Sequence, residues 1–295
     1  MRLVATLALL LLSASASSPA AQTLSVYRGD WSADTRNTWR DDDGEPRVQI
    51  NLGSNAGDNR WGFGVKLRDL AGLPASALAG AASNLQFSWT REAGTFRFAG
   101  SFDQGRGNGT YGFTPDQAFI TNMGAAGYRN LSTDDVVRLA VIDVTVAHVR
   151  GLAQAGYGNL PTDDVVRTRI HRVTPEFVRD LATVGYAKVP IDDLVRMAIH
   201  GATPANIKAL QAAGIRGQSV EDVIKFRIHK VTPEYIMAMK DVGFVTVSED
   251  QLVRMRIHKV DAQFVRDARA DGLAIQSPGD AVDLAIHGPK WRRRR

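Results

Sequence analysis

The chain has 295 residues, contains no cysteine and carries a formal net charge of +5 at pH 7. The lack of cysteine excludes disulfide bonds and anchoring through a lipid-modified cysteine, so the fold must rest on its own packing. The length is sufficient for two domains, or for one domain and a repeat array.

The positive charge is concentrated at the C-terminus. Residues 22–113 hold 10 basic and 10 acidic side chains, and residues 114–288 hold 20 basic and 21 acidic ones. The excess comes from residues 289–295, a basic tail containing Lys290 and Arg292 to Arg295. The sequence therefore predicts no specific nucleic-acid partner. It does predict a basic tail that is able to touch anionic surfaces.

Residues 1–21 have the pattern of a secretory signal peptide. An arginine precedes an apolar run from Leu3 to Leu12, and small residues follow with cleavage positions after Ala16, Ala20 or Ala21. The run is too short to span a bilayer, and no later stretch approaches 18 apolar residues. We therefore expect an exported protein without a transmembrane helix, located in the periplasm or, alternatively, outside the cell.

Residues 22–113 predict a small, mostly antiparallel β domain. Short alternating runs such as "RVQINL" and "NLQFSWT" are separated by Gly, Asn and Asp turns. Phe87 and Trp89 should face one way, with Phe96 and Phe98 opposite them across the "REAG" turn. One helical turn is expected around "LPASALAGAA". Because this domain runs directly into the first repeat, we expect it to cap the N-terminal end of the array.

Residues 114–288 are organised by a repeat of 29 residues. Its clearest marker is a glycine at the same register in each unit: Gly127, Gly156, Gly185, Gly214, Gly243 and Gly272. A period of this size indicates stacked units that cannot bury their apolar faces alone. In the first half of a unit, Thr174 suits an N-cap and Pro175 the first helical position, and Gly185 should end the helix.

The second half of each unit is ambiguous. "SEDQLVRMRIHK" opens like a capped helix, yet Val253, Met255 and Ile257 alternate with arginines as in a strand. We favour a helix because acidic residues at its start complement the helix dipole. The predicted fold class is therefore α+β: an antiparallel β domain followed by an α-solenoid of six helical hairpins. The alternative is a horseshoe of helix-plus-strand repeats.

The units, of the form "TPEF(V/I)…L…GY…(S/P)xDDLVRxxIH", resemble repeats of bacterial envelope proteins, including those attached to β-lactam-sensing antirepressor metallopeptidases. "REAGTFRFAGSFDQGRGNGTYGFTPD" is similar to the segment that often introduces such repeats, so the resemblance covers residues 84–288. The peptidase motif His-Glu-x-x-His is absent from this chain. Neither proteolysis nor signal transduction is therefore transferred to any residue here.

A histidine recurs near the end of five units: His171, His200, His229, His258 and His287. Equivalent residues in adjacent units should lie about 8–10 Å apart, whereas zinc needs its nitrogen ligands at about 2 Å. The histidines are better explained as structural joints that end the second helix, where they can cap carbonyls and interact with the dipole. The six marker glycines are the corresponding joints after the first helix.

Other candidates for catalysis also have structural explanations. Adjacent carboxylates such as Asp163 and Asp164 diverge by about 100° on a helix and recur in five units, unlike a single active site. The "DDDGE" segment lacks the alternation of a calcium loop, and the tryptophans Trp31, Trp39, Trp61 and Trp89 are better explained as core. The sequence contains no nucleophile elbow or phosphate loop, so we predict no catalytic, metal or cofactor site.

Two rows of cations are the candidate partner-binding residues. One row recurs at every 29th residue: Arg138, Arg167, Arg196, Lys225 and Arg254; the other recurs in part: Arg169, Arg227 and Arg256. Such rows would suit an acidic or extended partner. The alternative is that they pair with acids of adjacent repeats, which the array's near-neutral charge favours.

Three functions are compatible with these patterns. The first is a non-catalytic scaffold of the bacterial envelope that binds a protein or peptide along the array. The second is a hydrolase or carbohydrate-binding protein with its site in the β domain. The third, implied by the resemblance alone, is an accessory of an antirepressor or antibiotic-sensing system. The oligomeric state is not predicted.

Overall fold

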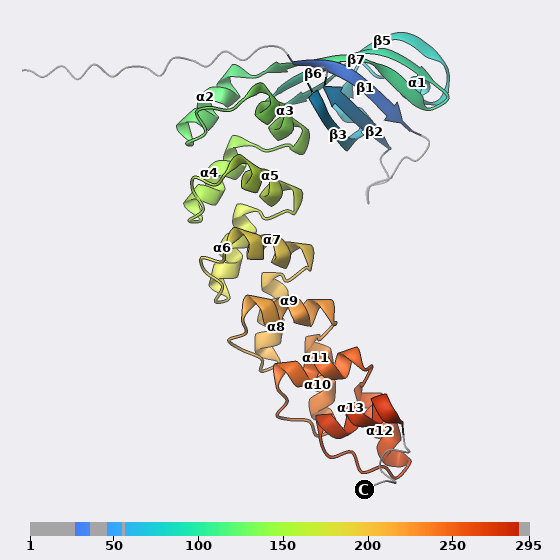
Figure 1. The fold of residues 1–295 in the computed structure, drawn as a ribbon, viewed down its shortest axis with the longest axis vertical. Helices are drawn as coiled ribbons and strands as arrows, with labels where there is room; N and C mark the ends of the chain where they lie inside the picture. Colours follow the sequence, from blue (N-terminus) through green and yellow to red (C-terminus); the bar gives the residue numbers. More distant parts are fainter. Residues whose placement is uncertain (1–26, 36–45, 55–56, 289–295) are drawn as a thin grey trace, which may run out of the picture.

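The computed structural model describes residues 27–35, 46–54 and 57–288. The predicted signal peptide (1–21) and basic tail (289–295) lie outside these residues, as do Trp39 and the acidic segment 41–45. Figure 1 shows a curled β-sheet from which a column of stacked helices extends. Among the described residues no helix is both long and apolar enough to cross a membrane.

The N-terminal domain is one antiparallel sheet with strand order β3-β2-β1-β7-β6-β5-β4. Its elements are β1 (Tyr27–Asp34), β2 (Arg47–Ser54), β3 (Gly57–Lys66), the 3₁₀ turn η1 (Leu67–Asp69), β4 (Leu70–Ala71), α1 (Ala75–Ala79), β5 (Ala82–Arg91), β6 (Gly94–Asp103) and β7 (Arg106–Pro115). The predicted hairpin is confirmed, because Trp89 pairs with Phe96 and Phe87 with Phe98. The helical turn is confirmed as α1.

The aromatic residues of this sheet face inward and cause the strands to curl around a common core. The Trp31 ring on β1 lies 5.3 Å from the Phe87 ring on β5, and the Phe63 ring on β3 lies 4.8 Å from the Trp89 ring on β5, measured between centroids. These strands are not neighbours in the sheet, so the contacts cross the interior. The burial of these large aromatic side chains, together with aliphatic residues such as Ile50 and Leu52, stabilises the domain.

The array consists of six helical hairpins. The first helices are α2 (Gln117–Ala125), α4 (Val146–Gln154), α6 (Pro175–Thr183), α8 (Pro204–Ala212), α10 (Pro233–Asp241) and α12 (Ala262–Ala270). The second helices are α3 (Thr133–Ile142), α5 (Thr162–Ile170), α7 (Ile191–Ile199), α9 (Val220–Ile228), α11 (Glu249–Ile257) and α13 (Pro278–His287). The second half of every unit is therefore a helix, and the horseshoe alternative is wrong.

The helix ends follow the predicted chemistry. The Thr174 hydroxyl accepts a hydrogen bond from the Phe177 N–H at 3.1 Å, and Pro175 is the first residue of α6. The six marker glycines all adopt positive φ, between 78° and 106°, just after the first helices. A residue with a Cβ is strained in this conformation, which explains the regular glycine.

Hydrogen bonds from tyrosines join the first repeats to one another. The hydroxyls of Tyr128 and Tyr157 donate to the carbonyls of Leu160 and Val189, at 2.9 and 2.7 Å, and that of Tyr186 continues the series. In each case the acceptor lies 32 residues further along the chain, in the next repeat. The stacking of repeats is thus fixed by the same directional bond at successive junctions.

The β domain caps the N-terminal end of this array, as predicted. Helix α3 packs against β1, β6 and β7, and one apolar core includes Phe96 and Phe113 of the sheet together with Val137 of α3. The Asp116 N–H donates to the Ala93 carbonyl at 3.0 Å. Strand β7 extends to Pro115, two residues past the predicted boundary at 113.

Candidate interaction surface

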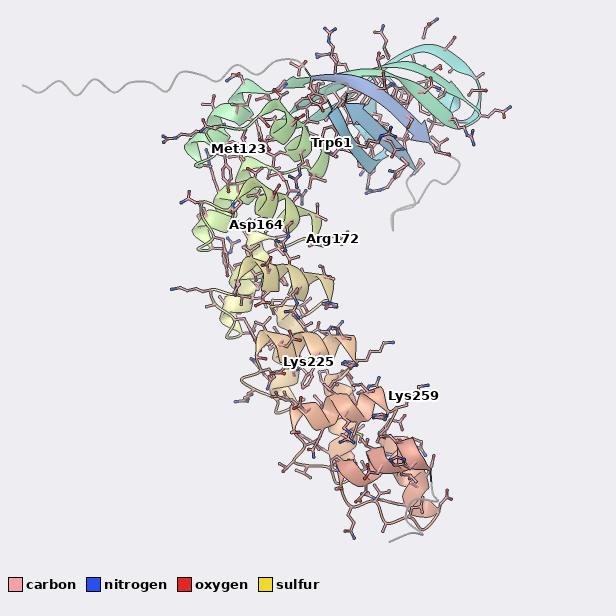
Figure 2. All side chains as sticks on the ribbon, in the orientation of Figure 1. Trp61, Met123, Asp164, Arg172, Lys225 and Lys259 are labelled. Atoms are coloured by element: carbon pink, nitrogen blue, oxygen red, sulfur yellow. The ribbon has the colours of Figure 1, made fainter. Side chains whose placement is uncertain are left out.

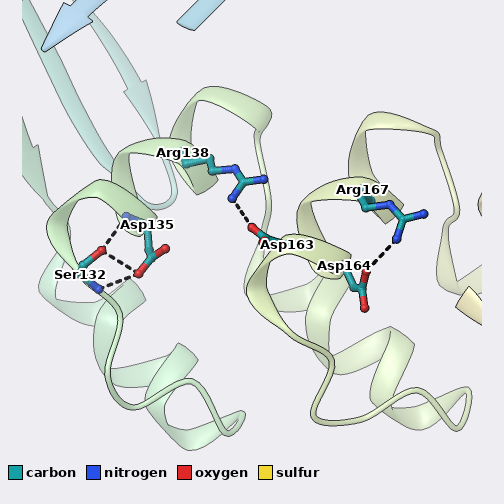
Figure 3. A network of polar contacts seen from close by, with 6 residues as sticks. All are labelled: Ser132, Asp135, Arg138, Asp163, Asp164 and Arg167. Atoms are coloured by element: carbon teal, nitrogen blue, oxygen red, sulfur yellow. Dashed lines mark hydrogen bonds and ion pairs between the residues drawn. The ribbon is translucent and has the colours of Figure 1, made fainter. Parts of the chain in front are cut away.

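The first cation row forms a ladder of ion pairs along the second helices. Arg138 pairs with Asp163 of the next repeat, and Arg167 pairs with Asp192 at 2.7 Å. Arg196 continues the ladder to Glu221 at 2.6 Å. Figure 3 shows the Arg138–Asp163 step, together with the hydrogen bond from Arg167 to Asp164 of its own helix, which is 3.0 Å long. These arginines therefore contact acids of adjacent repeats, which is the alternative to partner binding that the near-neutral charge of the array favours.

The ladder weakens toward the C-terminal end of the array. Among the described residues, the one ion pair of Lys225 is with Asp222 of its own helix, at 3.8 Å. Arg254 has no ion-pair partner among the described residues, because Gly279 occupies the register at which the next acid would stand.

Where the ladder is complete, the hydrogen bond from Arg196 lowers the pKa of Glu221. Because these side chains are solvated, each pair adds little stability on its own.

The second cation row joins consecutive repeats through main-chain carbonyls. Arg169 Nε donates to the Asp143 carbonyl at 2.8 Å, and Arg256 Nε to the His229 carbonyl at 3.2 Å. Arg227 makes a longer contact of the same kind, 3.4 Å, to the His200 carbonyl. These carbonyls lie at the ends of second helices, where no intrahelical donor remains. The row is thus used within the fold to complete the helix ends.

The recurring histidines lie at the ends of the second helices. His171, His200, His229 and His258 follow the last helical residue, and His287 is the last residue of α13. Across the described ranges, no histidine ring of this set hydrogen bonds to a terminal carbonyl; the second cation row fills part of that role. Nor do three His, Asp or Glu side chains gather there as metal ligands.

A partly buried polar pair lies in the second repeat: the sequence indicates His148 as a substituted packing position, but sequence reasoning did not identify its partner Thr168. His148 Nε2 lies 3.0 Å from Thr168 Oγ1, and the Thr168 hydroxyl also donates to the Val165 carbonyl at 2.6 Å. Thr168 is fully buried. The 29-residue register contained a signal for this pair, because aromatic residues mostly replace His148 in other units and large apolar residues replace Thr168.

The pair should make the array sensitive to acid. Burial, followed by the nearby charge of Arg169, lowers the pKa of His148. Because the pKa of His148 is lower in the folded protein than in the unfolded chain, the unfolded chain binds the proton more readily. The folded state therefore has its full stability above the unfolded-state pKa and loses stability as the pH falls below that value. We expect His148→Phe to reduce this loss, measured as urea-unfolding free energy at about pH 7.5 and about pH 5.5. An unchanged pH dependence in the variant would exclude His148 as the acid-sensitive group.

The most regular exposed feature is a line of isoleucines, which we call the isoleucine row. It contains Ile170, Ile199, Ile228, Ile257 and Ile286, whose exposed fractions are 52, 54, 50, 53 and 44%. Ile170 follows Arg167 and Asp163 by three and seven residues, so the row lies on the same helix face as the ladder. In the first repeat this position is Val141, which is 8% exposed and part of the β-domain core.

The β domain offers less for recognition. Trp31 and Trp89 are each 2% exposed and pack inside the sheet, so their faces are not open for stacking on a sugar. The outer face holds a shallow hollow lined by Arg28, Arg97 and Thr110. Among the described residues, Tyr111 is the one aromatic residue that lines this hollow. The surface with the most regular exposed chemistry is therefore the array.

Comparison of the chain with protein-family models and with curated proteins gives no match in either case.

Proposed function

We propose that this protein is an exported, non-catalytic scaffold that binds a protein or peptide along the second helices of its array. The observation that supports this proposal is the isoleucine row. Large aliphatic side chains that are scattered singly over a surface are normal, but an ordered series on one edge is typical of an interaction surface. Export rests on the pattern of residues 1–21, and the periplasm is the proposed location.

The cation rows are assigned a supporting role in this proposal. Their side chains hold acids and carbonyls of neighbouring repeats, and this keeps the second helices in a fixed arrangement. A rigid, repeated surface reduces the entropy lost when a partner binds. Repeat arrays of this kind commonly use extended surfaces for binding. Recognition is therefore assigned to the isoleucine row and the side chains beside it.

The double substitution Ile199→Asn and Ile228→Asn tests the proposal. Because both side chains are half exposed, we expect a stability change within about 0.5 kcal/mol per site. Cross-linking of the full chain in a native envelope extract should yield partners with the wild type and lose them with this variant. The matched control is Met237→Asn with Val245→Asn, since these apolar residues are 58 and 67% exposed away from the row. Equal capture by both variants, or turnover of a wall substrate by the purified protein, would refute the proposal.

A further inference from the structure

We infer that the occupant of the isoleucine row is an acidic, extended segment of a partner protein, with an apolar side chain at every third residue. This inference rests on the proposed function and specifies its ligand. It is carried by three features of the row: the cations beside it, the way the β domain covers the same edge in the first repeat, and the spacing of the repeats.

The first feature is a set of free cations two residues after the isoleucines. Arg172, Lys230 and Lys259 are exposed, and none has a side-chain ion pair within the described residues. They lie in the turns after α5, α9 and α11, whereas the acids of the ladder lie at the other ends of these helices. Figure 2 shows Arg172 and Lys259 along one edge of the array, with Asp164 toward the opposite end of its helix. The turns beside the isoleucine row thus carry these cations, while the nearest exposed acids, Glu176, Glu234 and Asp261, belong to the starts of the following first helices.

The backbone at these turns indicates that the cations are not incidental. Arg172, Lys230 and Lys259 have φ values of 58°, 56° and 58°, in the left-handed region that favours glycine. Gly201 and Gly288 stand at the same position after α7 and α13. Glycine is therefore compatible with this turn, yet three repeats place a long cation there against the backbone preference. The same conformation occurs at Asn159 and Lys188 in the turns before α5 and α7, so the recurrence of a cation at this register, rather than the strain itself, points to a role outside the fold.

The second feature is the covering of this edge in the first repeat. There Val141 takes the isoleucine position and is buried in the β-domain core, and Asp143 takes the turn position. The Asp143 carboxylate pairs with Arg169 of the second repeat at 2.7 Å, and it also lies 3.6 Å from the Arg91 guanidinium at the end of β5. The chain's own β domain thus covers the edge with a strand end of opposite charge. In later repeats the turn charge is reversed, so the complementary occupant is acidic.

The third feature is the spacing along the row. Packed helices lie about 8–10 Å apart. A chain in the extended polyproline II conformation has three residues per turn and advances about 3.1 Å per residue, so every third side chain lies on the same edge about 9 Å further on. An apolar side chain at every third residue of such a segment therefore meets each successive isoleucine. The intervening residues carry the acids that face Arg172, Lys230 and Lys259.

The test uses the full chain and labelled synthetic peptides. The probe is a peptide of six Glu-Ser-Leu triplets, and binding is measured by fluorescence anisotropy. The comparison peptides are a shuffled version with adjacent leucines, a Lys-Ser-Leu version, and a helical peptide of equal charge with one leucine per heptad. Vesicles of anionic phospholipid test for a membrane surface as the source of negative charge. We expect the triplet probe to bind more tightly than every comparison peptide and more tightly than the vesicles.

The sharpest variant combines Arg172→Gly, Lys230→Gly and Lys259→Gly. Because glycine suits the left-handed turn, this variant should unfold at the same or a higher urea concentration than the wild type. It should bind the triplet probe about tenfold more weakly, as expected for the loss of three exposed charge pairs. Lys188→Gly, which removes an exposed cation from a left-handed turn at the other end of the second helices, is the matched control and should leave binding unchanged.

Three results would overturn the inference. They are the absence of triplet-probe binding, equal or tighter binding of a comparison peptide or of vesicles, and full binding by the triple glycine variant. Each is distinguishable from failure of the proposed function. If envelope partners are still captured through Ile199 and Ile228, the scaffold function stands and only the chemistry of the occupant is wrong.

Discussion

Gly109→Ala is expected to destabilise the β domain by about 3 kcal/mol, because the added methyl group has no space. A Cβ at Gly109 would lie 2.0 Å from the Ala99 carbonyl oxygen and 2.8 Å from Trp31 Nε1. This indole group donates to the same carbonyl at 3.2 Å, so the contact cannot be relieved by moving one flexible side chain. The curl of β6 and β7 therefore depends on glycine here. Urea unfolding followed by tryptophan fluorescence measures the effect.

Gly124→Ala is the matched control for this substitution. Gly124 lies inside α2, and apart from the helix's own backbone nothing approaches the position of an added Cβ within 4 Å. Alanine has the higher helix propensity, so this variant should gain up to about 1 kcal/mol. Equal effects of the two substitutions would show that the close approach of β6 and β7 is not a determinant of the sheet's stability.

The second large effect is expected inside the array. Leu181 of α6 is completely buried in the apolar cluster that joins the second to the fourth repeat. Leu181→Ala removes buried surface and leaves a cavity, which typically costs 2–5 kcal/mol, so we expect a loss of about 3 kcal/mol. Because each repeat contacts only its neighbours, the loss should be local. Native-state hydrogen exchange should show faster exchange in residues 146–228 than in β6 and β7.

The control for Leu181→Ala is Met237→Ala on α10, whose side chain is exposed and should change stability by less than about 0.5 kcal/mol. A uniform increase in exchange across the sheet and the array would contradict the local character of the effect. It would show instead that the β domain and all six repeats unfold as one cooperative unit.

The periodic part of the fold was predictable from the sequence for a physical reason. Each glycine of the 29-residue register serves a local conformation, and Thr174 with Pro175 defines a helix start without help from distant residues. The second half of each repeat could be predicted as a helix only because Asp and Glu stand at its start. The alternation of Val253, Met255 and Ile257 misleads because Ile257 is exposed, whereas Met255 is buried.

Features that depend on distant partners were not predictable. The pairing of β1 with β7 joins segments more than 70 residues apart, and no local pattern specifies it. The sequence favoured pairing of the cation rows with acids of adjacent repeats, which Arg167 and Asp192 show, but it did not indicate that Arg169 donates to a main-chain carbonyl 26 residues earlier. The isoleucine row was hidden inside the recurring "IH" motif, where an apolar residue is ordinarily assigned to the core.

The tyrosine bonds and the ladder have a consequence for the length of the protein. Among the first four repeats, both connect chemically equivalent positions of consecutive repeats with a constant offset, so these three junctions share the same chemistry. Removal of residues 172–200 would bring Gln218 to the Tyr157 hydroxyl and Glu221 to Arg167, the bonding pattern that Tyr186 and Arg196 already show. A whole unit in this part of the array can therefore be gained or lost in register, so the length of the array can change while its cap and the chemistry of these junctions stay the same.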